Sequence, residues 1–355
     1  MNNKVVLWWG RSDVDYSRNR IVRQLFVELG WKIIDFQPKV SALADVEANF
    51  KSLGNVSLVW VPCFRQRDLA AAKRWAKRRQ LPLIFDPLIS AYDKQVFERK
   101  KFSEQSKKAK KLLKWEQCLL QAADYLLADT QQHADFYIET MKVNAERVAV
   151  LPVGAEESLF QPRNMISDVN LPVQILFFGS YIALQGPEII AEAIKLYEGD
   201  EVEWHFVGDG PLRETVQTSL IGIKNVHFSD WLPYEQLPEK IAQADICLGI
   251  FGTTEKTRRV IANKVYQALA CARPVVSCES EAYPAQLQGN PNSGIYFVPS
   301  NNPQALADML AQLASQPEKL KQARQAAFSS YQQYFSNALL KKQLSTILQR
   351  AALLN

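Results

Sequence analysis

The chain has few of the residues that build metal and redox sites. Only three histidines occur among its 355 residues, His133, His205 and His227, and none stands at metal-ligand spacing from another. The five cysteines are odd in number, form no Cys-x-x-Cys pair and mostly lie in apolar surroundings, as buried thiols in a reducing compartment do. We therefore expect neither a zinc site nor a disulfide framework.

Long apolar runs and targeting signals are also lacking. No run approaches the roughly 18–20 residues of a membrane-spanning helix, and the N-terminus, MNNKVVLWWGRSDVD, does not have the design of a signal peptide. We expect a cytoplasmic protein. The segment GDGPLRE also lacks the Gly-x-Gly-x-x-Gly spacing of dinucleotide-binding folds. This argues against an NAD-dependent oxidoreductase.

Apolar strands alternate with amphipathic helices along the whole chain, which predicts an α/β fold of two doubly wound parallel sheets. A chain of this length holds two domains of ordinary size. We expect the first at 1–165 and the second at 166–327, with C-terminal helices over 328–355. The pattern predicts one long basic helix from Val96 to Gln121.

The stretch from Phe251 to Pro274 carries three cations, Arg258, Arg259 and Lys264, between a predicted strand and the helix NKVYQALA. Helix N-termini favour anions, and phosphate is the usual occupant. This arrangement predicts a phosphate site. A solvated basic loop that merely connects two elements would have the same composition.

Two polar loops of the first half, 10–20 and 86–94, follow predicted strands, at the edge where parallel sheets bind ligands. The second supplies three candidate catalytic residues, Asp86, Ser90 and Tyr92. A carboxylate such as Asp86 can accept a proton from an acceptor hydroxyl. The alternative is that Asp86 and Ser90 only cap the following helix.

Positive charge is concentrated in the first half of the chain. Residues 1–165 hold 27 Lys and Arg against 19 Asp and Glu, whereas the remainder holds 15 against 18. The segment Lys94–Lys114 alone has nine cations, with Phe97, Phe102 and Trp115 in or beside it. It is either a solvated helix face or a surface for anionic membranes; no nucleic-acid-binding signature accompanies it, and we expect no nucleic-acid partner.

Four segments, in order, resemble the GT-B retaining glycosyltransferases of the large family 4 type (glycosyl transferases group 1), in its bacterial cell-surface polysaccharide and glycolipid subgroup. They are VAVLPVGAEESLFQP, ILFFGSYIALQGPEIIAEAIKL, WHFVGDGPLRE and NKVYQALACARPVV, and they cover most of 148–300. The loops GRSDVDYSRNR and FDPLISAYDK resemble segments of the bacterial subgroup. The resemblance implies two Rossmann-like domains facing a cleft, with C-terminal helices returning to the first domain.

The resemblance further implies transfer of a sugar from a UDP- or GDP-linked donor to a glycolipid, polysaccharide or other acceptor. It implies retention of configuration and no required metal or other cofactor. The resembling segments and the strand ends supply the donor-side candidates, which are Gly10, Arg11, Arg18, Gly179, Tyr181, Gln185, Gly208, Asp209, Trp231, Glu255, Arg258, Arg259, Lys264 and Gln267.

The sequence departs from the family pattern at its charged positions. Ser180 and Gln185 stand where relatives carry an Arg and a Lys for the donor diphosphate. Gln267 replaces a ribose-binding glutamate, Arg259 stands eight residues earlier in place of a second glutamate, and no histidine follows the strand before Asp86. The alternative function is therefore a catalytically silent GT-B subunit that binds nucleotide as a scaffold.

Overall fold

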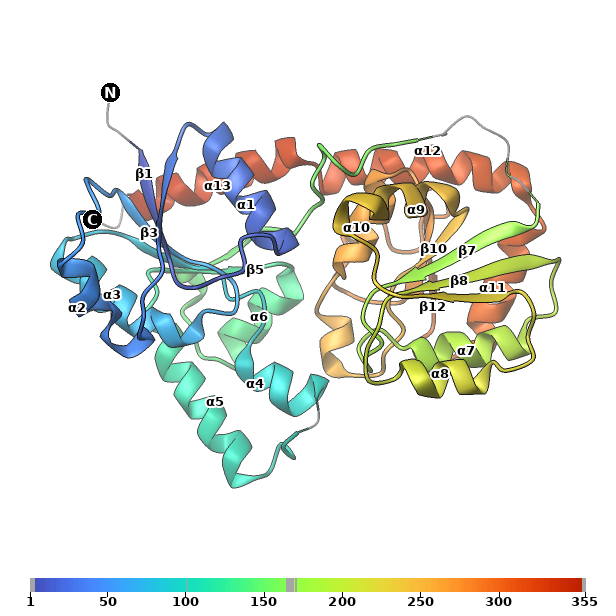
Figure 1. The fold of residues 1–355 in the computed structure, drawn as a ribbon, viewed down its shortest axis with the longest axis horizontal. Helices are drawn as coiled ribbons and strands as arrows, with labels where there is room; N and C mark the ends of the chain where they lie inside the picture. Colours follow the sequence, from blue (N-terminus) through green and yellow to red (C-terminus); the bar gives the residue numbers. More distant parts are fainter. Residues whose placement is uncertain (1–3, 100, 164–168, 170, 353–355) are drawn as a thin grey trace. The chain divides into compact units, whose positions relative to one another are not determined.

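The chain forms two compact units (Figure 1). The computed structural model describes residues 4–99, 101–163, 169 and 171–352. Unit 1 comprises residues 1–153 and 337–355, and unit 2 comprises residues 154–336. The boundary expected between 165 and 166 falls in a segment, 164–168, that lies outside the described residues.

Unit 1 is built on a six-stranded parallel sheet in the order β2-β1-β3-β4-β5-β6. Its strands are short, and the inner ones are almost continuously apolar, as strands covered on both faces are. The edge strand β2 has two charged, exposed residues, Lys32 and Asp35. The first strand lies between β2 and β3, so the chain winds away from it in both directions. The strands are β1 (Val5–Trp9), β2 (Lys32–Phe36), β3 (Leu58–Val61), β4 (Leu83–Phe85), β5 (Tyr125–Ala128) and β6 (Val148–Val150).

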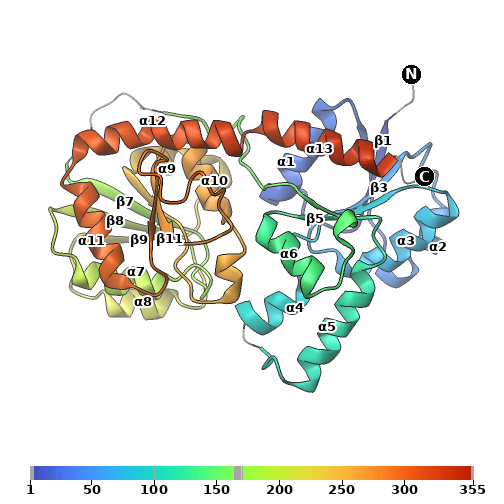
Figure 2. The same ribbon diagram turned by 180° about the vertical axis from the view of Figure 1, so that it is seen from behind.

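Helices cover both faces of this sheet. Two of them, α1 (Ser17–Glu28) and α13 (Asn337–Ala352), lie side by side on one face (Figures 1 and 2). Beneath α1, Phe26 packs edge-on against Trp60, which stacks on Trp8. The remaining helices of the unit are α2 (Ala44–Asn49), α3 (Leu69–Arg78), α4 (Ala91–Asp93), α5 (Lys107–Leu120) and α6 (Gln131–Glu139).

The basic helix expected from Val96 to Gln121 is interrupted, and that prediction is wrong. A π-helical turn covers Lys94–Glu98, and α5 begins only at Lys107. Ser106 ends the interruption, because its hydroxyl accepts a hydrogen bond of 3.1 Å from the backbone N–H of Ala109. Serine is among the strongest N-cap residues, and this local signal sets the residue at which α5 begins.

Unit 2 repeats the architecture with the strand order β12-β11-β10-β7-β8-β9, again all parallel. Its strands are β7 (Val173–Phe178), β8 (Val202–Val207), β9 (Val226–Ser229), β10 (Ile246–Leu248), β11 (Val275–Cys278) and β12 (Ile295–Val298). Its helices are α7 (Pro187–Leu196), α8 (Arg213–Ser219), α9 (Leu237–Gln243), α10 (Asn263–Ala270), α11 (Pro303–Ala314) and α12 (Pro317–Tyr334).

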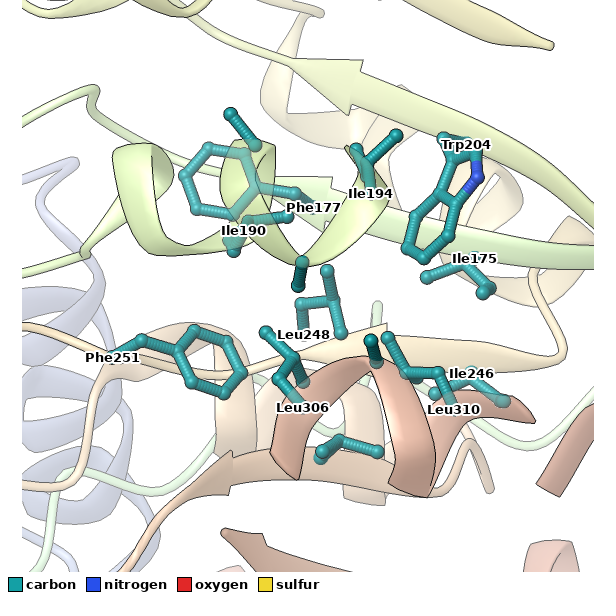
Figure 3. Close-up of a cluster of buried hydrophobic side chains, with 14 of the residues drawn as sticks. Ile175, Phe177, Ile190, Ile194, Trp204, Ile246, Leu248, Phe251, Leu306 and Leu310 are labelled. Atoms are coloured by element: carbon teal, nitrogen blue, oxygen red, sulfur yellow. The ribbon is translucent and has the colours of Figure 1, made fainter. Parts of the chain in front are cut away.

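The core of unit 2 fixes the first strand of its sheet between two layers of helices. On one face, side chains of α7 and α11 meet those of β7, β8 and β10 (Figure 3). On the other face lie α9, α10 and α12 (Figures 1 and 2). A buried ion pair ties α12 to the sheet, since Arg324 lies 2.6 Å from Asp245 just before β10. None of the described helices is both long and apolar enough to span a bilayer.

Candidate functional site

The loops that follow β7, β8 and β10 meet at the carboxyl edge of the unit 2 sheet. Strand order reverses at β7, and ligands of open α/β sheets bind beside such a reversal. Backbone hydrogen bonds hold the loops together, from Gly179 N–H to Val207 (3.0 Å), Tyr181 N–H to Asp209 (3.0 Å) and Gly252 N–H to Leu184 (3.2 Å). The predicted strand–glycine–helix segments thus form one rigid cradle.

Glycine is required where two of these loops cross. A Cβ atom on Gly208 would lie 2.2 Å from the carbonyl oxygen of Gly179, and Gly208 has a φ of +128°. Gly179 itself has a φ of +136°, a conformation that other residues rarely adopt. Its missing side chain leaves space beside the backbone at the end of β7.

Lys264 points into this space from the first turn of α10. A Cβ atom on Gly179 would lie 3.2 Å from Cε and 3.3 Å from Nζ of Lys264. The ammonium is 3.8 Å from the centroid of the Phe177 ring and has no hydrogen-bond partner within the described residues. Burial lowers the pKa of Lys264 well below its ordinary value. A buried cation of this kind is costly unless it is paired, so the position suits an anionic ligand group.

Two amides accompany Lys264. The Oε1 atom of Gln185 is buried, has no partner in the described part of the chain, and would lie 3.9 Å from a Cβ atom on Gly179. Gln267 is 5% exposed and follows Lys264 by three residues on α10, which puts both side chains on one face of that helix. Tyr181 is fully buried among Phe177 and Phe206, and burial raises the pKa of its hydroxyl.

The other donor-side candidates of unit 2 lie in different surroundings. Glu255 and Arg258 line a cavity of about 810 Å³ beside β12, where Arg258 lies 3.5 Å from Glu281. Arg259 is partly exposed. Asp209 and Trp231 are exposed. The structure therefore brings together Gly179, Gln185 and Lys264 and places Arg258 beside Glu281, and the predicted roles of Arg258 and Arg259 in binding a diphosphate stay predictions.

In unit 1, two candidates form one buried ion pair, Arg18 in the first turn of α1 and Asp86 after β4. The Arg18 guanidinium donates to both carboxylate oxygens of Asp86, at 2.8 and 3.3 Å. It also donates to the carbonyls of Leu151 and Pro152, at 2.9 and 2.6 Å. Burial raises the pKa of the Asp86 carboxyl, and Arg18 opposes this shift only in part. Asp86 is 2% exposed. Because Arg18 contacts both Asp86 and the two carbonyls that follow β6, it connects the end of β4 to the end of β6.

Ser90 and Tyr92 belong to a second buried network that the sequence did not reveal. The carboxylate of Glu116 accepts hydrogen bonds from the Ser90 hydroxyl (2.7 Å) and the backbone N–H groups of Ala91 and Tyr92 (2.7 and 2.8 Å). Ser90 also accepts from the N–H of Asp93, which makes it the N-cap of α4. The capping role considered for Ser90 is present, whereas Asp86 caps no helix. The catalytic roles of Asp86, Ser90 and Tyr92 stay predictions.

Gly10 and Arg11 stand at the carboxyl end of β1, where the strand order of unit 1 reverses. Gly10 has a φ of +130°, and a Cβ atom there would lie 2.9 Å from the buried carboxylate of Asp68. Arg11 is exposed. Sequence reasoning missed Asp68, although it follows β3 by only a few residues and the same rule on strand ends could have found it. No three His, Cys, Asp or Glu side chains of the described residues gather as metal ligands.

Part of the chain is similar to known glycosyltransferases. Residues 172–316 match the family described as glycosyl transferases group 1. The amylovoran biosynthesis glycosyltransferase AmsK of Erwinia amylovora is 24% identical over 217 residues, which cover 59% of this chain and 52% of the relative. The probable glycosyltransferase WbjE of Pseudomonas aeruginosa is 26% identical over 188 residues, which cover 48% and 45%. The chain spans about half the length of these curated relatives.

Solved structures resemble the chain over nearly its whole length. HepE of Anabaena, solved in complex with UDP, superposes with a TM-score of 0.71 at 15% identity, over 98% of this chain and 100% of that one. Sucrose-phosphate synthase of Thermosynechococcus elongatus gives 0.74 at 17% identity, over 100% of both chains. The protein therefore has the two-domain GT-B fold that its sequence predicted, and its second unit carries the segment that matches the group 1 glycosyltransferase family.

Proposed function

We propose that the protein is a glycosyltransferase that takes a sugar from a UDP- or GDP-linked donor. The acceptor is a glycolipid, a polysaccharide or another saccharide, and the anomeric configuration is retained. The family match over 172–316 and the two bacterial relatives support this proposal. Solved complexes of HepE with UDP and with UDP-glucose support a nucleotide-sugar donor.

The observation that carries the proposal is the buried, unpartnered ammonium of Lys264 beside Gly179. During glycosyl transfer, negative charge grows on the leaving diphosphate oxygen, and a fixed cation in a dry site stabilises that charge strongly. The N-terminal turn of α10 adds its backbone N–H groups to the same position. Lys264 and α10 together supply the positive charge, and we propose that no metal is required.

The amide of Gln267 completes the donor site in this proposal. It lies on the Lys264 face of α10, and its carbonyl oxygen can accept a hydrogen bond from a ribose hydroxyl as a carboxylate would. The acceptor is proposed to bind to unit 1, beside the loops that begin at Gly10 and Asp86. In this proposal the Arg18–Asp86 pair positions the loops. The acceptor hydroxyl passes its proton to the donor phosphate, so no free carboxylate is needed as a base.

The decisive experiment is a screen of UDP- and GDP-sugars by thermal shift, followed by a transfer assay with radiolabelled donor and extracted glycolipids. A ligand at 100 times its Kd stabilises the folded state by about 2.7 kcal/mol, which a shift in Tm reports. We expect stabilisation by one donor class, retained in Lys224→Ala and lost in Lys264→Ala. Lys224 is an exposed lysine of the same unit and serves as the matched control.

A catalytically silent scaffold is the second candidate, because Arg259 and Gln267 replace the two glutamates that relatives carry. It predicts donor binding that depends on Lys264 without transfer to any extracted acceptor and without donor hydrolysis. Absence of binding by every UDP- and GDP-sugar would contradict both candidates.

A further inference from the structure

A groove of about 770 Å³ opens on unit 1 between α5 and the segment before α2. Its wall includes Leu112, Trp115 and Leu119 of α5, and Arg67 beside the start of α3. Arg11, the residue after Gly10, also lines it, so the groove reaches the carboxyl end of β1. None of the residues proposed to hold the donor in unit 2 belongs to it.

One side of the groove is apolar and open to solvent. Leu112, Trp115 and Leu119 are spaced by three and four residues, so they form one stripe along α5. Trp115 is 42% exposed. Val40, which also lines the groove, is 53% exposed, and the segment that follows it in the chain exposes Leu43, Val46 and Phe50 by 61%, 49% and 87%. Gathered apolar side chains of this size on a surface mark an interaction site.

The other side of the groove is cationic. Arg11, Lys39 and Arg67 line it, and none of them forms an ion pair with a described carboxylate. No acidic residue lines the groove. On the side of α5, all five lysines of the helix are exposed, while its one acid, Glu116, is buried and held by α4. On the other side, Glu47 accepts a hydrogen bond from the backbone N–H of Lys39. The occupant must therefore carry negative charge next to an apolar part.

We infer that the groove binds one anionic lipid, with its phosphate at Arg11, Lys39 and Arg67 and its chain along Trp115. The lysines of α5 then face the anionic headgroups of the same membrane surface, where each cation contributes about 1 kcal/mol. Phe50 and Leu43 enter the interface between the headgroups and the acyl chains of the membrane. A nucleic acid bound at this surface would leave these apolar side chains in water. This inference stands independently of sugar transfer.

Binding is measured with the full chain and vesicles of phosphatidylglycerol, with vesicles of phosphatidylcholine as the uncharged comparison. The test variant is Arg11→Gln with Arg67→Gln, two exposed groove cations. The matched control is Lys32→Gln with Lys224→Gln, two exposed lysines away from the groove. We expect the groove variant to bind phosphatidylglycerol about thirtyfold more weakly than the control, equivalent to about 2 kcal/mol. Equal affinity of the two variants would overturn the inference.

A second measurement reports whether the chain enters the groove. Phosphatidylglycerol brominated in its acyl chains quenches nearby tryptophans, and we expect most of that quenching to disappear in Trp115→Phe. Phe50→Ser, a change at an exposed position, should weaken vesicle binding with an unchanged Tm. Persistent quenching in Trp115→Phe means adsorption through the α5 lysines alone and contradicts the lipid site. Displacement by millimolar glycerol phosphate would show a free phosphate site and contradict it equally.

Discussion

The Nζ atom of Lys264 lies 3.8 Å from the centroid of the Phe177 ring, at the strand end where Gly179 has no side chain. The ring is fixed, because Phe177 is buried in the core of unit 2 against Tyr181 and Phe206. A cation over an aromatic face gains some electrostatic compensation when it is removed from water. The ammonium is thereby held in one position before any ligand arrives.

Lys264→Met should separate stability from binding. Methionine keeps most of the packing on Phe177 and removes a buried cation that lacks a partner, so we expect the free protein to gain about 1–3 kcal/mol of unfolding free energy at neutral pH. Nucleoside diphosphate affinity should fall more than tenfold, or about 1.4 kcal/mol. Chemical denaturation and calorimetry measure the two effects. A variant with lower stability and unchanged affinity would contradict the role of Lys264.

Nucleotide binding should take up protons. Burial lowers the pKa of Lys264 in the free protein, and a bound diphosphate raises it again, so protons are gained wherever the pH lies between the two values. Affinity should therefore fall as pH rises through that window. Calorimetry in two buffers of different ionisation enthalpy reports the uptake, which should vanish in Lys264→Met. Equal uptake in both proteins would assign it to another group.

Gly179→Ala should abolish nucleotide binding as well as lower stability. Its Cβ atom would lie 3.3 Å from Lys264 Nζ and fill the space beside β7, at a φ of +136°. Gly222→Ala supplies the control, because Gly222 has a φ of +91° and nothing within 4 Å of an added Cβ atom. Both changes should cost about 1–3 kcal/mol of stability, measured by denaturation. Only Gly179→Ala should lose affinity, and equal affinities would exclude a ligand in that space.

Asp86→Asn should destabilise the protein by about 3–5 kcal/mol, because it leaves the buried Arg18 guanidinium without its counter-charge. Replacing both partners, with Arg18→Met and Asp86→Leu, should restore at least half of that loss. Restoration stays partial since two backbone carbonyls lose their donor. The double variant also tests catalysis: parental turnover in this folded protein would exclude a role of Asp86 in transfer.

The sequence was sufficient for the fold because its strong local signals agree with the tertiary structure. The predicted helix NKVYQALA is α10 from Asn263 to Ala270, and the predicted strand 295–298 is β12. The prediction for the basic segment failed because residues 99–106 hold only one apolar residue, Phe102, and a new helix begins after the Ser106 N-cap. A single capping hydroxyl is a weak signal beside nine cations and several aromatic residues.

The candidate site was only partly predictable, since partners far apart in the chain decide what each side chain does. Lys264 could be found from its place after a strand and a loop. The burial of Lys264 against Phe177 could not be predicted, because it depends on the packing of β7 against α10. Asp86 looked free at a strand end, but Arg18, 68 residues earlier, occupies both of its oxygens. The sequence did not reveal the role of Glu116, because its hydrogen-bond partners lie about 25 residues earlier in the chain.

Helix α13 belongs to unit 1, although residues 154–336 are made before it. It packs on α1, where Lys341 lies 3.3 Å from Glu28, and buries Leu340, Leu344 and Ile347. At about 5–20 residues per second, the ribosome needs roughly 10–40 s to make the intervening unit. During that time the apolar groups that α13 covers stay uncovered on the nascent chain. The unit whose synthesis begins first therefore completes its folding only after the whole of the unit that follows it has been made.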